Sequence, residues 1–121
     1  MNAAVSWVGV ALAGGVGAVL RLVVDAAIGR WGGGLPLGTF AVNLSGAFVL
    51  GLLDGLVLPP HAALVVGTGL VGAYTTFSTW MFETQRLAEE RRLPAATANV
   101  VGSLVAGAAA AVVGLWLGGG L

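Results

Sequence analysis

Residues 62–82 read AALVVGTGLVGAYTTFSTWMF, a run long and apolar enough to cross a bilayer but poorly suited to a regular helix in its second half. A membrane-spanning helix needs about 20 mostly apolar residues, and this run meets that length. Gly67, Gly69 and Gly72 lead into consecutive threonines, and both residue types lower helix propensity. This run therefore decides between a bundle of plain helices and a bundle whose third helix is broken.

The residues alone leave both forms of the third helix open. A break near Thr75 would free backbone carbonyls at membrane depth, which is tolerated only where they are buried in protein or line a polar cavity. Carbonyls of broken membrane helices commonly hold a cation. The alternative is a continuous helix in which the hydroxyls of residues 75–79 bond back to the preceding turn.

The composition around this run predicts a membrane protein. Of the 121 residues, 58% are hydrophobic and only 8% are charged, whereas a soluble domain carries about 25% charged residues. The first apolar stretch lacks the positive leader of a signal peptide, so we expect it to stay as a helix. We expect an all-α fold in which residues 1–121 form a single transmembrane domain. Its four predicted helices span residues 5–24, 37–58, 62–82 and 95–117.

Several classes of function are disfavoured by the same sequence. It contains no cysteine, which excludes disulfides and thiolate metal sites. The net charge is zero and no Lys/Arg run occurs, which argues against nucleic-acid binding. The lone histidine, His61, lies in a two-proline turn. Asp25, Asp54 and Glu83 lie at or near expected helix ends, where carboxylates reach water, and form no acid/base pair. We therefore expect no enzyme.

The cationic residues all fall toward one side of the expected bundle. If the four helices alternate in direction, the loops after the first and third helices share a face, and the opposite face carries both termini without Lys or Arg. The positive-inside rule then predicts a multi-pass protein of the cell inner (plasma) membrane, with cytoplasmic arginine loops and external termini. The residues concerned are Arg21, Arg30, Arg86, Arg91 and Arg92.

Polar side chains within the expected helices suggest a pathway for a small anion. Asn43 lies nearest the centre of the second helix, and its amide offers two uncharged donors. A dehydrated anion needs such donors, and a buried cation would hold it too tightly to leave. Ring edges carry positive quadrupole character, so Phe77 and Trp80 could also face an anion. For Ser45 and Ser103, hydrogen bonding between helices is the simpler interpretation.

At these residues the sequence resembles the Fluc (CrcB) family of fluoride channels along nearly the whole chain. Residues 14–21, GGVGAVLR, are similar to the family's glycine-rich first helix that ends in arginine. Residues 38–48, GTFAVNLSGAF, resemble its GTLxxNxxGxF, and residues 72–79, GAYTTFST, resemble its GGxTTFSTF. Asn99 and Ser103 match its fourth helix. The four motifs occur in order and at the family's spacing, which makes the resemblance specific.

The resemblance implies a passive channel that lets fluoride leave the cell and so reduces fluoride toxicity. It implies an antiparallel dimer with two pores and a third helix broken in mid-membrane. Backbone carbonyls of Gly72 and Thr75 would hold a structural Na⁺ that is not transported. Arg21 would be structural or lie at a vestibule. The implied fluoride pathway consists of Asn43, Phe77, Ser78, Thr79, Trp80 and Ser103.

Two residues depart from the family pattern. Ala73 replaces the second glycine of the family's GG pair. This replacement should be tolerated, because backbone carbonyls and not side chains would hold the cation. Trp80 replaces the second pore phenylalanine, and its bulk and N–H donor would alter or block the pore. Self-pairing members show little Lys/Arg bias, whereas here every arginine lies to one side. We therefore interpret the chain as one subunit of a heterodimeric pair.

Three alternatives remain. The chain could form a homodimeric channel, or it could be a non-conducting subunit that completes a partner's pore, which the Trp80 substitution keeps open. It could also be a proton-coupled exporter of small drugs or guanidinium. Such an exporter needs a carboxylate within the membrane, and residues 5–24 contain none. This last alternative is therefore disfavoured.

Overall fold

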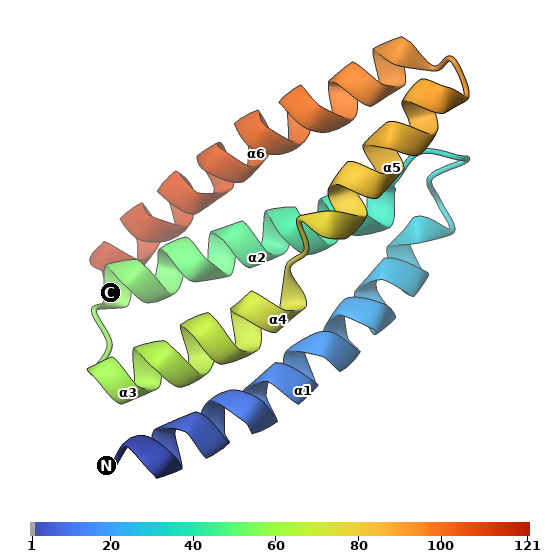
Figure 1. Cartoon of the computed structure of the whole chain (residues 1–121). Helices are drawn as coiled ribbons and strands as arrows, with labels where there is room; N and C mark the ends of the chain where they lie inside the picture. Colours follow the sequence, from blue (N-terminus) through green and yellow to red (C-terminus); the bar gives the residue numbers. More distant parts are fainter. Residues whose placement is uncertain (1) are drawn as a thin grey trace.

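The computed structural model describes residues 2–121, and every regular element in that range is helical (Figure 1). Four rods lie side by side, and both termini lie at the same end of the bundle as the link between the second and third rods. The third rod consists of several short elements in succession. In chain order the elements are α1 (Ala3–Gly29), α2 (Leu37–Leu56), α3 (Pro60–Ala62), η1 (Ala63–Val71), α4 (Gly72–Tyr74), α5 (Ser78–Glu89) and α6 (Leu93–Gly119).

Each rod is long and apolar enough to cross a membrane, counting residues 60–89 as one span. The first and fourth helices are longer than the predicted 5–24 and 95–117. The second ends at Leu56 rather than at residue 58, because Val57 adopts a left-handed conformation with φ of 53° ahead of two prolines. Apolar content located the spans well, but it is a poor guide to their ends.

The largest correction concerns residues 83–89, which we expected to begin a charged loop. They continue α5 to Glu89. Their sequence, ETQRLAE, consists largely of strong helix formers, so the helix persists where its side chains become charged. Leu87 in this segment is fully buried, which ties the charged end of α5 to the bundle.

Glycines allow α2 and α6 to pack backbone against backbone. A side-chain carbon added at Gly51 would collide with the carbonyl oxygen of Ala111, and one added at Gly114 would collide with that of Phe48. Small residues at such crossings let helices in lipid approach closely, and dispersion then holds them together. This contact fixes the position of α2, which carries Asn43.

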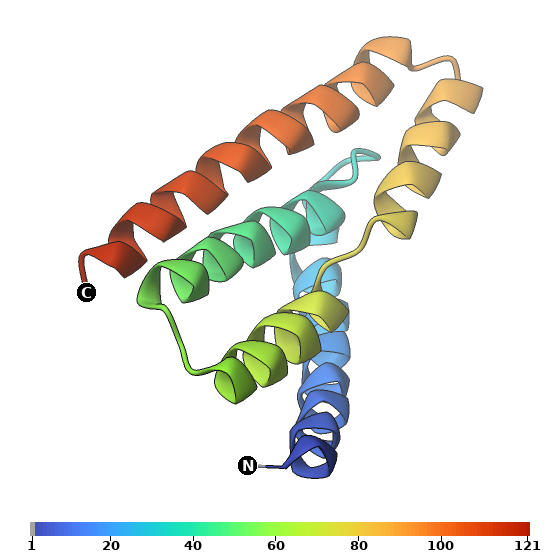
Figure 2. The same ribbon diagram turned by 60° about the vertical axis from the view of Figure 1, so that its left-hand side comes forward.

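A second glycine contact sets α1 against the third rod. A side chain at Gly17 would collide with the carbonyl of Leu70 in η1, and Gly69 in η1 lies against Val10. The element η1 is a π-helix, a wider winding than the α-helix that often occurs near functional sites. In the rotated view of Figure 2, α1 passes behind this rod, while α2 and α6 run alongside each other.

Much of the outer surface is apolar. Large side chains such as Leu12, Leu22 and Val105 are about two-thirds exposed, whereas Val42 and Leu87 are the fully buried large side chains. In water such a surface would drive association, but in a bilayer it faces lipid or another subunit. Most of the buried residues are therefore small, whereas many of the large apolar side chains are exposed.

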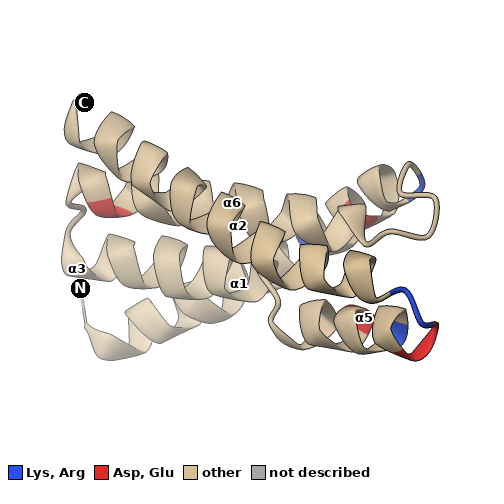
Figure 3. Ribbon diagram, turned by 90° about the horizontal axis from the view of Figure 1, so that it is seen from above, with Lys and Arg blue, Asp and Glu red and all other residues tan. Residues whose placement is uncertain are grey.

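The charged residues gather mainly at one end, where the α1–α2 and α5–α6 loops lie (Figure 3). The guanidinium of Arg30 lies over the Trp31 ring, 5.0 Å from its centroid. Arg92 Nη1 donates to the carbonyl of Gly34 at 3.4 Å and so connects the two loops. The other end carries both termini and Asp54.

We predict that Gly114→Ala destabilises the protein by about 1–3 kcal/mol, because the added methyl group forces α2 and α6 apart. Gly102→Ala, on the same helix with no neighbouring atom against a new methyl group, is the matched control. It should be neutral or slightly stabilising, because alanine favours a helix over glycine. Thermal unfolding in detergent measures the stability of both variants. Equal melting temperatures for the two would contradict the close packing of α2 against α6 at Gly114.

Candidate functional site

The third rod is interrupted between α4 and α5. Thr75 has an extended conformation with ψ of 161°, and α5 begins at Ser78. The Thr75 N–H still donates to the Val71 carbonyl at 3.0 Å, and the Thr75 hydroxyl donates to that same oxygen at 3.1 Å. The chain therefore leaves the helical conformation at Thr75, and Thr76 is the first residue whose N–H leaves the helical hydrogen-bond pattern.

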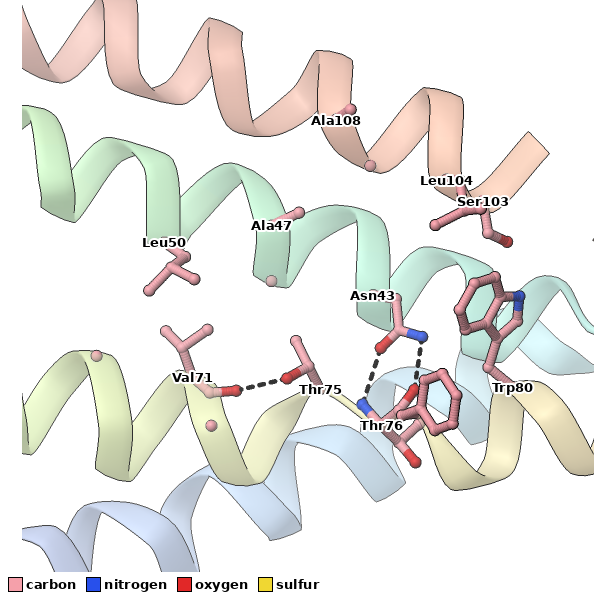
Figure 4. Close-up of a pocket in the computed structure, with 15 residues that line it drawn as sticks. Asn43, Ala47, Leu50, Val71, Thr75, Thr76, Trp80, Ser103, Leu104 and Ala108 are labelled. Atoms are coloured by element: carbon pink, nitrogen blue, oxygen red, sulfur yellow. Dashed lines mark hydrogen bonds between the residues drawn. The ribbon is translucent and has the colours of Figure 1, made fainter. Parts of the chain in front are cut away.

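The Asn43 side chain takes over the backbone hydrogen bonds of Thr76 (Figure 4). The Thr76 N–H donates to Asn43 Oδ1 at 2.9 Å, and Asn43 Nδ2 donates to the Thr76 carbonyl at 2.8 Å. Both groups are partly buried, where an unpaired backbone group costs about 1–3 kcal/mol. One amide thus satisfies a donor and an acceptor together, and of the two N–H donors of Asn43 one is already engaged.

Further contacts hold the interrupted segment against α2. The Thr76 hydroxyl accepts the N–H of Thr79 at 3.2 Å and so satisfies one N–H in the first turn of α5. Tyr74 and Ser45 share a hydrogen bond of 2.9 Å between their hydroxyls. A side chain at Gly46 would collide with the methyl group of Thr75, so the close approach requires glycine there.

An open groove of about 540 Å³ runs beside the interrupted segment. Its walls come from α2, η1, α4, α5 and α6, and most of them are apolar, with few polar side chains. The structure brings six of the predicted site residues to this groove. They are Asn43, Gly72, Thr75, Phe77, Trp80 and Ser103.

The other predicted residues lie elsewhere. Thr79 and Arg21 line a smaller, more enclosed pocket of about 170 Å³, together with Asp25. Thr76 borders both this pocket and the groove, so it separates the two spaces. Ser78 is exposed and lines neither of them.

Two aromatic rings flank the groove. The centroids of Phe77 and Trp80 are 5.8 Å apart with planes at 81°, the edge-to-face arrangement that aromatic pairs favour. Phe77 is 70% exposed in this single chain, so its ring is available to a second subunit or an ion. The Trp80 N–H, expected as a donor in the pore, donates instead to the Asn99 carbonyl at 3.0 Å.

Two buried polar atoms have no hydrogen-bond partner within residues 2–121, Ser103 Oγ and Glu83 Oε1. Ser103 borders the groove, although its hydroxyl oxygen is itself buried. Glu83 was expected near a helix end within reach of water. Because α5 continues to Glu89, Glu83 lies instead in the middle of that helix with one carboxylate oxygen buried.

Sequence reasoning did not include Thr76, Gly46 or Thr84 in the site. Thr76 is 33 residues from Asn43, its partner, so no short-range spacing connects them. The available signal was the weak helix propensity of consecutive threonines, which locates the interruption but not the side chain that stabilises it.

The comparisons with known proteins identify the family. Residues 8–115 match the family model described as "CrcB-like protein, Camphor Resistance (CrcB)". The chain belongs to the CrcB-like family. A protein of Mycolicibacterium paratuberculosis named "Fluoride-specific ion channel FluC 2" is 63% identical over 94% of both chains. One of Mycobacterium bovis with the same name is 56% identical, over 92% of this chain and 89% of that protein.

The CrcB-like relatives carry two numbered names. A protein of Leifsonia xyli named "Fluoride-specific ion channel FluC 1" is 49% identical over 91% of this chain and 84% of its own length. These names describe ion channels and not enzymes. The resemblance found in the sequence is thus confirmed, and with four apolar spans the chain is a multi-pass membrane protein.

We predict that Asn43→Leu speeds hydrogen exchange at the Thr76 amide by about fivefold, because its acceptor is lost and the bond contributes about 1 kcal/mol. In Asn43→Asp the carboxylate keeps the Thr76 N–H bonded while the donor to the Thr76 carbonyl is lost. Exchange at Thr76 should therefore stay slow in that variant. Mass spectrometry of the exchanged protein measures the exchange rate in both variants. Fast exchange at Thr76 in the unmodified chain would contradict the hydrogen bonds between Asn43 and Thr76.

Proposed function

We propose that the chain conducts fluoride selectively across the membrane by passive electrodiffusion and thereby reduces fluoride toxicity inside the cell. The observation that carries this proposal is the 63% identity, over 94% of both chains, with a relative named as a fluoride-specific channel. The groove adds physical support, because it combines uncharged donors with aromatic edges and no cationic side chain lines it. Such a lining attracts an anion without trapping it.

The proposed fluoride pathway runs along the groove and past the start of α5. Asn43 keeps one amide hydrogen after bonding to Thr76, and Ser103 Oγ has no partner within the described chain. The edges of Phe77 and Trp80 supply further weak positive character. Arg21 lies in the neighbouring pocket, where its charge can draw anions toward the pathway without lining it. The residues assigned to the pathway are Asn43, Phe77, Ser78, Thr79, Trp80 and Ser103.

A second subunit is needed to close this pathway. The groove is open along one side, and Phe77 beside it is mostly exposed. Open backbone and polar groups at membrane depth are not left facing lipid. We therefore propose a dimer in antiparallel orientation, with the interrupted segment at mid-membrane in each subunit. In this arrangement the groove meets protein instead of lipid.

A structural Na⁺ fits the interrupted segment. None of the backbone hydrogen bonds recorded outside the helices of residues 2–121 ends on the carbonyl of Gly72 or Thr75. The same residues contain no cluster of His, Asp and Glu that could hold a metal. We propose that the Gly72 and Thr75 carbonyls hold a Na⁺ that is not transported. Its charge would offset converging carbonyl dipoles where two subunits meet.

We further propose that the chain is one subunit of a heterodimeric pair. The arginines of the α1–α2 and α5–α6 loops lie at one end (Figure 3), which favours one insertion direction with that end cytoplasmic and both termini outside. The relatives' numbered names, FluC 1 and FluC 2, are compatible with paired subunits. A homodimer would require half of the copies to insert against this charge bias.

The rival functions lack such support. An exporter of small cations needs a carboxylate within the membrane, and the groove has none among its lining residues. A non-conducting subunit remains the second candidate, because Trp80 is bulkier than phenylalanine. However, the Trp80 N–H is bonded to the Asn99 carbonyl of α6 and so does not add a polar donor to the groove. This argues against a pore whose chemistry differs from that of a phenylalanine-lined one.

The proposal predicts that liposomes containing the purified chain release fluoride and not chloride, measured with ion-selective electrodes. Asn43→Asp should abolish the release, because it puts a negative charge where the anion is bound. Asn2→Asp is the matched control. Asn2 caps α1 through a side-chain oxygen that aspartate also has, so release should be unchanged.

If the folded chain alone releases nothing, a relative with the opposite charge bias is added during reconstitution. Fluoride release only from the mixture would identify an obligate pair. No release from either preparation would contradict the proposed function.

The orientation proposal predicts that a C-terminal alkaline phosphatase is active and a C-terminal green fluorescent protein is dark, because both report an external terminus. A variant with Asn2→Arg, Arg91→Ala and Arg92→Ala should show both signals, because its charge bias is weakened. Dual signals from the unmodified chain would rule out a single orientation and favour the homodimer.

A further inference from the structure

Two side chains connect α5 to α6 beside the groove, Trp80 and Asn99. The indole N–H of Trp80 donates to the Asn99 backbone carbonyl at 3.0 Å. The Asn99 amide donates in return to Thr84 Oγ1 at 2.8 Å and lies 3.5 Å from the Trp80 carbonyl oxygen. The Thr84 hydroxyl donates to that same carbonyl at 2.9 Å. The three residues thus form a closed, partly buried set of hydrogen bonds.

Asn99 and Trp80 face different spaces. Trp80 lines the groove, whereas Asn99 does not, and lines instead a separate apolar pocket of about 280 Å³ beside Pro36 and Phe40. In Figure 4 the indole nitrogen lies on the side of the Trp80 ring away from the Asn43 amide. Asn99 therefore does not line the groove, and its hydrogen bonds reach that space through Trp80.

The bond to α6 decides which part of the indole the groove meets. Tryptophan has one polar atom, an N–H donor, and the remaining edge consists of C–H groups with weak positive character. Rotation about the bond to an aromatic ring is broad when no partner holds the ring. With its N–H bonded to Asn99 and its ring edge-to-face with Phe77, Trp80 is held in one orientation.

We infer that Asn99 is a positioning residue: its side chain, bonded to Thr84, holds its own backbone carbonyl where that carbonyl accepts the indole N–H. The polar edge of Trp80 is thereby turned toward α6 and the carbon edge toward the groove. The tryptophan then presents the groove with the same chemistry as a phenylalanine would. This inference rests on the proposed fluoride channel and adds the specificity-determining role of a residue outside the groove. It also explains how a bulkier aromatic is accommodated, since its extra atoms lie against α6.

Fluorescence of Trp80 tests the orientation without any transport measurement. A chain with Trp7→Phe, Trp31→Phe and Trp116→Phe retains Trp80 as its only tryptophan. Asn99→Ala keeps the backbone carbonyl that accepts the indole N–H, but it removes the amide that ties α6 to Thr84 and holds this carbonyl in place. In this background Asn99→Ala should therefore shift the emission to longer wavelength and increase quenching by acrylamide, because the indole is held less firmly. Thr84→Val should do the same without changing α6. Thr97→Ala, at an exposed position of α6, is the control and should change neither.

Emission and quenching that stay unchanged in both Asn99→Ala and Thr84→Val would overturn the inference. If Asn99→Ala does not fold, Thr84→Val decides the question alone, since it leaves the shape of α5 nearly unchanged.

A double-mutant cycle then tests the effect on the ion pathway. Asn99→Ala should lower fluoride release from liposomes by about fivefold, the size of effect expected from one lost hydrogen bond. In a Trp80→Phe background it should cause no further loss, because phenylalanine has no N–H and the exact position of the residue 99 carbonyl then no longer matters. Equal losses in both backgrounds would overturn the positioning role. If neither the unmodified chain nor its mixture with a relative of opposite charge bias releases fluoride, the proposed function fails, while the fluorescence result still decides how Trp80 is held.

Discussion

The reciprocal pair between the Asn43 amide and the Thr76 backbone is the interaction on which the rest of the site depends. A helix that stops within a bilayer leaves N–H and C=O groups that water cannot reach, and each costs several kcal/mol unless it is paired. Asn43 pairs one donor and one acceptor at 2.9 and 2.8 Å. The interruption at Thr75–Phe77 can therefore persist, and with it the position of Phe77 and the unpaired carbonyls before it.

Glycines place this pair at the right distance. Gly46 lets α2 approach Thr75, and Gly51 and Gly114 set α2 against α6. A methyl group at any of the three would meet a backbone or side-chain atom and displace the helix that carries Asn43. Because helices in lipid are held mainly by packing, the small residues serve as positioning elements and not only as space savers. The geometry of a polar pair is thus set by residues that contain no polar side chain.

The sequence predicted the parts of this fold that depend on local properties. Apolar runs located four spans, and the threonines of the third span indicated a weak helix. What the sequence could not supply were pairings between distant residues. That Asn43 bonds Thr76, and that Trp80 bonds Asn99, depends on how glycine contacts rotate and separate the rods. Hydropathy also placed Glu83 beyond the end of the third helix, because a charged stretch lowers the hydropathy and suggests a loop. The residues up to Glu89 nevertheless favour a helix, and α5 continues through them.

The hydrogen bonds that hold the helices together also explain why a pathway of this kind would contain so few strong donors. Asn43 gives one of its two amide hydrogens to Thr76, and Trp80 gives its N–H to α6. What remains at the groove is one amide hydrogen, the hydroxyls of Thr76 and Ser103, and ring edges, all uncharged. A groove with every donor free would bind a dehydrated anion tightly and release it slowly, whereas conduction needs entry and exit to be comparably easy. In the proposed channel, the hydrogen bonds that stabilise the fold therefore also weaken the site enough for an ion to leave.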